Sequence, residues 1–110
     1  MNADLPFIPD NVTVHLGRPE ENVRNVTVPF LDYVANVASS EIYPTWPESA
    51  IRANMYAQIS FVLNRIYTEY YRSRGYDFDI TSSTSIDQSF VYGREIFENI
   101  RALASELFDS

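Results

Sequence analysis

The chain has 110 residues, of which 45% are hydrophobic and 21% are charged, and it carries a formal net charge of −7. This composition is typical of one globular domain with a single core, and it excludes a disordered tail and a membrane-spanning chain. The excess of acidic residues argues against nonspecific binding to nucleic acid or anionic lipid, and the absence of cysteine excludes a disulfide framework and a cysteine-ligated zinc site.

A β-hairpin is predicted from residue 12 to residue 28, after an extended leading segment over residues 5–10. Apolar and polar residues alternate on both sides of a turn at residues 17–22, and this period of two is typical of half-buried strands. His15, the only histidine, falls in the first predicted strand. A lone histidine in a strand is interpreted as structural and not as a ligand, so no metal site is expected.

The first helix is predicted from about Pro29 to Ile42. Phe30, Val34 and Val37 recur at helical spacing and mark its buried face. Thr27 is expected to cap the N-terminus of this helix, because a threonine hydroxyl accepts a hydrogen bond from a free N–H of the first turn.

The longest helix is predicted from Pro47 to Arg74. Thr45 and Glu48 have the spacing of a capping box, and Gly75 suits the position just after a helix end. Apolar side chains follow at helical spacing along the whole length: Ile51, Met55, Ile59, Val62, Ile66 and Tyr70. A helix of this length is expected to form the spine of the domain.

The C-terminal third is predicted to hold a short extended segment, a polar loop and a last helix. Alternation over residues 76–80 favours a short strand, residues 81–85 are all serine or threonine, and an apolar stripe predicts a helix from about Gly93 to Phe108. Together the elements predict an α+β fold, mainly helical, in which a short N-terminal β-hairpin lies against a long central helix flanked by two shorter helices.

Glu41 is the candidate catalytic residue. On a helix it lies only about 20° from the apolar residues Phe30 and Val34, so its carboxyl group is expected to project from the inward face. It also lies in the last turn, where the helix dipole disfavours negative charge. Desolvation and the dipole both favour the protonated carboxyl group, which is the state that a general acid needs. The alternative is a frayed helix end, from which Glu41 turns to solvent or pairs with an arginine.

The residues around Glu41 resemble a known family. The run from Leu31 to Ala57, LDYVANVASSEIYPTWPESAIRANMYA, is similar to the core of the stage II sporulation protein D (SpoIID) and amidase-enhancer LytB family. That pattern has a helix ending in Glu-(Met or Ile)-x-Pro, followed by Trp-Pro and an alanine-rich helix. The family's second block, a Thr/Ser stretch followed by Gln, an aromatic residue and Gly, is similar to residues 81–93.

The resemblance implies action on bacterial peptidoglycan, because sporulation members of the family are lytic transglycosylases that cleave glycan strands stripped of their stem peptides. It implies that Glu41 is the single catalytic acid/base. It also implies that Gln88, Ser83 and Thr84 contact the substrate and stabilise the positive charge that builds on the sugar ring. No cofactor is expected.

Two aromatic residues flank the Glu41 motif and are candidates for stacking on sugar faces: Tyr43 and Trp46. Asp87 is a candidate second carboxylate, although an aspartate in a loop more often caps a helix or forms a turn. Because family members continue past the second block, the chain is expected to be one SpoIID/LytB-like domain over residues 1–110 that is truncated at its C-terminus.

Two other function classes stay open. One is a noncatalytic peptidoglycan-binding or amidase-activating module, in which the same site holds glycan without cutting it. The other is a helical interaction domain. The expected partners are peptidoglycan glycan strands and a cell-wall amidase, with no nucleic acid and no membrane span. The resemblance implies an extracellular or cell-wall location, although the first residues show no signal peptide.

Overall fold

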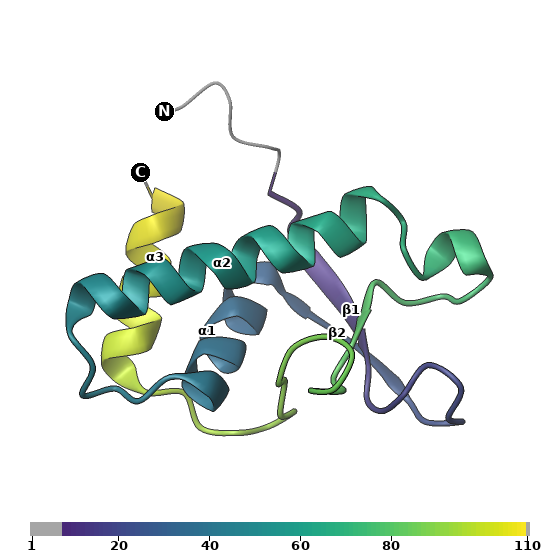
Figure 1. Ribbon diagram of the computed structural model, residues 1–110, viewed down its shortest axis with the longest axis horizontal. Helices are drawn as coiled ribbons and strands as arrows, with labels where there is room; N and C mark the ends of the chain where they lie inside the picture. Colours follow the sequence, from purple (N-terminus) through teal and green to yellow (C-terminus); the bar gives the residue numbers. More distant parts are fainter. Residues whose placement is uncertain (1–7, 110) are drawn as a thin grey trace.

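Figure 1 shows the computed structural model of the protein, which describes residues 8–109. The elements follow in the order β1 (Asn11–His15), β2 (Asn25–Pro29), α1 (Phe30–Glu41), α2 (Glu48–Tyr67), η1 (Arg72–Arg74), β3 (Ile80–Thr81) and α3 (Glu98–Asp109). The α+β prediction is confirmed, because a hairpin comes first and the long helix α2 is flanked by two shorter helices. Residues 5–7 of the predicted leading segment lie outside the described residues.

β1 is the central strand of a three-stranded sheet with the order β2–β1–β3. β1 and β2 pair antiparallel with Val12 opposite Val28, as the predicted hairpin requires. The side chains of Val12 and Val14 are buried, so the alternation in the sequence marks the core face of the sheet. β3 has two residues and pairs parallel to β1, and it begins at the last residue of the strand predicted over residues 76–80.

The most enclosed helix is α1, which packs against the sheet, α2 and α3. Every residue from Tyr33 to Ser39 is buried, and the observed bounds agree with the predicted helix. The predicted cap is wrong: Pro29 precedes the first turn and no side chain caps it. The hydroxyl of Thr27 lies 3.0 Å from that of Thr13 on the neighbouring strand, so a cross-strand pair takes the place of the cap.

α2 is shorter than predicted, because it ends at Tyr67 and not at residue 74. Glu69 has a φ of 51°, a left-handed backbone conformation that a helix cannot continue through. The turn lets Tyr71 pack on Phe78 with ring centroids 5.0 Å apart, and it leaves the Tyr71 side chain buried. Tertiary packing therefore outweighs the helical pattern of the sequence.

Two further helix ends differ from the prediction. α3 begins at Glu98 and not at Gly93, which has a φ of 85°. Just before the helix, the Phe97 N–H donates a hydrogen bond to Ser39 Oγ at 3.3 Å. The predicted capping box of α2 is absent, because Pro47 is its N-cap residue and no side chain caps the helix. Within residues 8–109, no helix combines the length and the apolar character that a bilayer crossing requires.

The connecting segment, residues 82–97, joins β3 to α3 without helix or strand and passes the C-terminal end of α1 (Figure 1). At Val91, a buried side chain on α1 makes the backbone hydrogen bonds that a neighbouring strand would make. Asn36 Nδ2 donates to the Val91 carbonyl oxygen at 2.9 Å, and the Val91 N–H donates to Asn36 Oδ1 at 3.0 Å. One amide therefore satisfies both backbone groups of Val91 and fixes the segment against α1.

Candidate functional site

Glu41 is the last residue of α1, and its side chain is exposed. The predicted burial of this carboxyl group is therefore wrong: the helix ends here, Ile42 turns into the core instead, and Glu41 emerges at the rim. The carboxyl group is nevertheless held on both sides. Oε1 accepts a hydrogen bond from Gln58 Nε2 at 3.1 Å, and Oε2 accepts one from the Ser89 N–H at 3.0 Å.

A buried chain of polar contacts lies behind Glu41. Gln88 is only 5% exposed and both ends of its amide are used. Its Oε1 accepts a hydrogen bond from the Tyr33 hydroxyl at 2.9 Å, and its Nε2 donates to the Gln58 carbonyl oxygen at 3.0 Å. Gln88 is thus linked to Glu41 through Gln58 and the neighbouring Ser89, and its own side chain is turned inward. Burial raises the pKa of the Tyr33 hydroxyl well above its usual value, and the charges of Asp87 and Glu41 raise it further.

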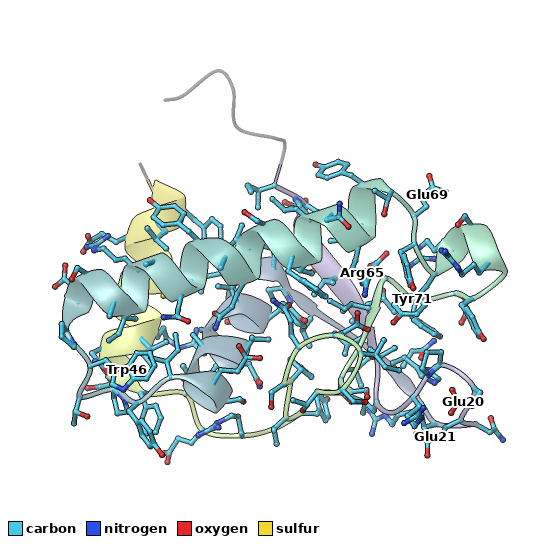
Figure 2. All side chains as sticks on the ribbon, in the orientation of Figure 1. Glu20, Glu21, Trp46, Arg65, Glu69 and Tyr71 are labelled. Atoms are coloured by element: carbon cyan, nitrogen blue, oxygen red, sulfur yellow. The ribbon has the colours of Figure 1, made fainter. Side chains whose placement is uncertain are left out.

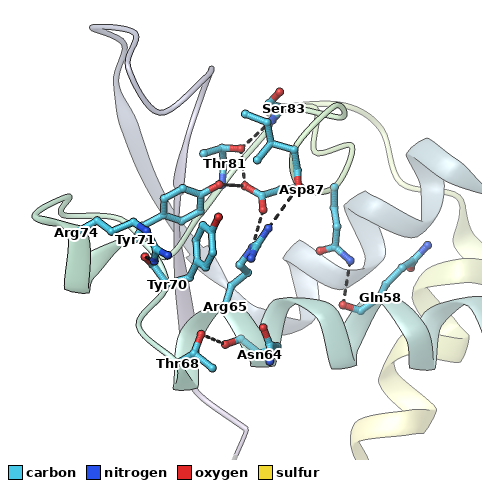
Figure 3. A network of polar contacts seen from close by, with 12 residues as sticks. Gln58, Asn64, Arg65, Thr68, Tyr70, Tyr71, Arg74, Thr81, Ser83 and Asp87 are labelled. Carbon is cyan, nitrogen blue, oxygen red and sulfur yellow. Dashed lines mark hydrogen bonds and ion pairs between the residues drawn. The ribbon is translucent and has the colours of Figure 1, made fainter.

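Asp87 lies at the centre of the polar network in Figure 3, and its side chain is fully buried. Its Oδ1 accepts a hydrogen bond from Arg65 Nε at 2.8 Å. Its Oδ2 accepts hydrogen bonds of 2.6 Å from the hydroxyls of Tyr71 and Thr81, and one of 3.0 Å from the Thr81 N–H. Burial, followed by the hydrogen bond and charge of Asp87, raises the pKa of the Tyr71 hydroxyl.

This network anchors the connecting segment to α2. Arg65 is sandwiched among aromatic rings, with its guanidinium carbon 3.8 Å from the Tyr70 ring centroid and 4.9 Å from that of Phe61. A carboxylate with no exposed surface and four hydrogen bonds cannot reach a substrate, so Asp87 is a structural anion. It holds the residues that follow it, including Ser89, in position against Glu41.

The other candidate residues fall into two pairs, Ser83 with Thr84 and Tyr43 with Trp46. Ser83 and Thr84 lie in the turn before Asp87, where the Ser83 hydroxyl is 3.0 Å from that of Ser85 and Thr84 is exposed. Tyr43 is 71% exposed and Trp46 is 39% exposed, with ring centroids 6.4 Å apart, just after the end of α1. In Figure 2, Trp46 lies at the opposite end of the molecule from Arg65 and Tyr71.

Trp46 also lines an open surface pocket of about 270 Å³ between the start of α2 and α3. Its floor is apolar, formed by Ile51 and Leu103, and its rim carries Asn99 and two carboxylates, which an arginine of α2 already pairs. The pocket is separate from the polar contacts of Glu41.

Sequence reasoning missed Gln58, Arg65 and the anchoring role of Tyr71. A signal for Gln58 was present, because this glutamine stands on the same helix face as Ile51, Met55 and Val62. Among residues 8–109, no cluster of three or more histidine, aspartate or glutamate residues is arranged to hold a metal ion. Comparisons of the chain with known protein families, with curated proteins and with solved structures gave no match.

Proposed function

We propose that the protein is a lytic-transglycosylase-like domain that cleaves peptidoglycan glycan strands with Glu41 as its single acid/base. The observation that carries the proposal is the setting of this carboxyl group. It is exposed at the end of α1, yet two donors from separate parts of the chain fix its direction. An acid/base needs both access to the substrate and a fixed orientation. The resemblance of residues 31–57 to the SpoIID/LytB pattern supports the same residue.

The reaction would proceed with one carboxyl group. Protonated Glu41 gives its proton to the bridging glycosidic oxygen as the bond from that oxygen to C1 of the sugar breaks. The resulting carboxylate then takes the proton of the same sugar's C6 hydroxyl as the hydroxyl oxygen bonds to C1. The product carries a 1,6-anhydro end, and no water is consumed.

This chemistry agrees with the burial of Asp87. Hydrolysing glycosidases need a second carboxyl group to activate water or to attack the sugar. A transglycosylase that uses the sugar's own hydroxyl does not, so the inaccessibility of Asp87 is no obstacle. During the reaction one oxygen of Glu41 must exchange its N–H donor for the glycosidic oxygen. The exposed side of the carboxyl group allows that exchange.

Glycan binding would rest on aromatic stacking and hydrogen bonds. The net charge of −7 does not attract an anionic wall polymer. Tyr43 and Trp46 present exposed ring surface within the segment that follows Glu41, and such rings stack on sugar faces. Thr84, exposed in the connecting segment, remains a proposed hydrogen-bonding contact, together with Ser83.

The test is mass spectrometry of the products formed from glycan strands without stem peptides. Wild-type protein should release fragments with 1,6-anhydro ends, and Glu41→Gln should release none, because glutamine keeps the shape of the side chain but cannot transfer the proton. The control is circular dichroism of both proteins, which should be identical. Failure of the wild-type protein to form any anhydro product refutes the enzymatic proposal.

The second candidate is a noncatalytic module that binds peptidoglycan or activates a cell-wall amidase. The large exposed surface of Tyr43 beside Trp46 favours it, because stacking alone suffices for binding. In that case wild-type protein and Glu41→Gln should sediment equally with purified peptidoglycan and neither should release product. An extracellular or cell-wall location follows from either candidate.

A further inference from the structure

We propose that Gln58 is a positioning residue for Glu41 and that its side-chain amide supports this carboxyl group in both of its protonation states. The catalytic meaning of this inference rests on the proposed function. The contact between the two side chains does not, and it can be measured in the absence of any substrate.

Gln58 occupies a core position of α2. It is 6% exposed and lies on the helix face that also buries Met55 and Val62. An apolar side chain is the ordinary choice at such a position, because burying an amide is unfavourable unless its hydrogen bonds are made. The amide of Gln58 makes one side-chain hydrogen bond, from Nε2 to Glu41 Oε1. The glutamine therefore contributes a hydrogen bond to the Glu41 carboxyl group, whereas an apolar side chain would pack better in the core.

The oxygen at the other end of this amide, Gln58 Oε1, is buried and has no hydrogen-bond partner within residues 8–109. Rotating the amide by about 180° about its last bond exchanges oxygen and nitrogen with almost no change in shape. Oε1 would then face Glu41 and, while no substrate is bound, accept a hydrogen bond from the neutral carboxyl group. When substrate binds, this single proton turns from Gln58 to the glycosidic oxygen. The two orientations therefore suit the carboxylate and the carboxylic acid in turn, and the proposed reaction passes through both.

Neighbouring residues hold Gln58 and Glu41 in position relative to each other. The Gln58 carbonyl oxygen is held by Gln88, and the next residue of that segment, Ser89, holds the second oxygen of Glu41. The charges of Asp87 and Glu41 both act on the Tyr33 hydroxyl, and Arg94 Nη1 donates to the hydroxyl of Ser40, which precedes Glu41 in the chain.

The experiment follows the carboxyl carbon of Glu41 by NMR during a pH titration of the wild-type protein and of Gln58→Met. Methionine fills a similar volume and offers no hydrogen-bond donor. Hydrogen bonds to a charged acceptor are the stronger ones, so the titration midpoint of Glu41 should be higher in the variant than in the wild type. The matched control is Asn54→Met, one turn earlier on α2, where the side chain of an exposed asparagine donates to the Ala50 carbonyl oxygen. The control midpoint should equal that of the wild type.

A second readout needs no core substitution and decides the matter if Gln58→Met does not fold. In the wild-type protein the side-chain NH₂ signals of Gln58 should change at the same pH as the Glu41 carboxyl carbon. In Glu41→Gln they should be independent of pH. Two results overturn the inference. One is a set of Gln58 signals that stay constant while Glu41 titrates, and the other is an unchanged Glu41 midpoint in a folded Gln58→Met.

Activity separates this inference from the proposed function. With glycan as substrate, Gln58→Met should lower kcat about 10-fold to 100-fold and leave KM unchanged, because the lost contact orients the acid and does not bind the sugar. If the Glu41 midpoint is higher in Gln58→Met than in the wild type, and the wild type forms no anhydro product, the enzymatic proposal is refuted and the contact is supported. An unchanged midpoint in an active enzyme refutes the contact alone.

Discussion

Replacing Asp87 with asparagine should destabilise the protein by about 3–5 kcal/mol, the usual effect of breaking a buried ion pair from one side. Asparagine has the same shape but offers one acceptor oxygen where aspartate offers two. If that oxygen faces Tyr71 and Thr81, the amide N–H groups face Arg65, donor against donor. If the amide is reversed, three hydrogen bonds to Oδ2 are lost. In both orientations Arg65, whose side chain is only 15% exposed, loses its counter-ion.

Urea unfolding followed by circular dichroism measures this change as a lower midpoint at an unchanged slope. Domains of this size are stable by only about 5–15 kcal/mol, so the loss should be easily resolved. The matched control is Asp32→Asn, which removes an ion pair of 2.9 Å between Asp32 and Arg101 whose side chains are 43% and 47% exposed. Its effect should be below about 1 kcal/mol, because solvent screens such pairs. Equal effects of the two substitutions would refute the reasoning.

Two other predictions concern alkaline pH and a turn. Burial raises the pKa of Tyr33 and Tyr71 above the unfolded value near 10, so the folded state releases these protons later than the unfolded chain. That stabilisation is complete below about pH 10 and declines as the pH rises above it. The part of the tyrosinate absorbance that comes from Tyr33 and Tyr71 should therefore appear together with loss of circular dichroism, and Tyr71→Phe should make the decline less steep. Gly75→Ala should cost about 1 kcal/mol in urea unfolding, because Gly75 has a φ of 92° and an added Cβ meets no atom within 4 Å, so only the backbone penalty remains. A neutral effect there contradicts the backbone argument.

The elements that sequence predicts correctly are those set by local periodicity. Val12 and Val14 alternate with polar neighbours because one face of β1 is buried, and the spacing of Phe30, Val34 and Val37 on α1 has the same cause. The helix ends are predicted less well. No local pattern predicts the turn at Glu69, because the turn is stabilised by a distant contact. It places the Tyr71 hydroxyl against Asp87 of the connecting segment.

The candidate site also contains features that the sequence predicts and features that depend on tertiary contacts. Glu41 can be singled out from helical geometry and from the motif around it, and the structure gives it two fixed hydrogen bonds. The sequence left open whether this carboxyl group is buried or turns to solvent, because the position of the rim depends on how α2 crosses α1. The inward orientation of Gln88 likewise depends on Tyr33, a residue on another element. Contacts of this kind join distant parts of the chain and leave no periodic trace in the sequence.

The contacts of Glu41 also bear on the order of folding. Its two donors lie 17 and 48 residues away along the chain, and the Asn36–Val91 pair that fixes the connecting segment spans 55. Closing such long loops is slow relative to forming helices. A nascent chain can therefore acquire all three helices while the carboxyl group still points freely into water. The fixed arrangement of Glu41 between its two donors therefore arises only with the last docking step.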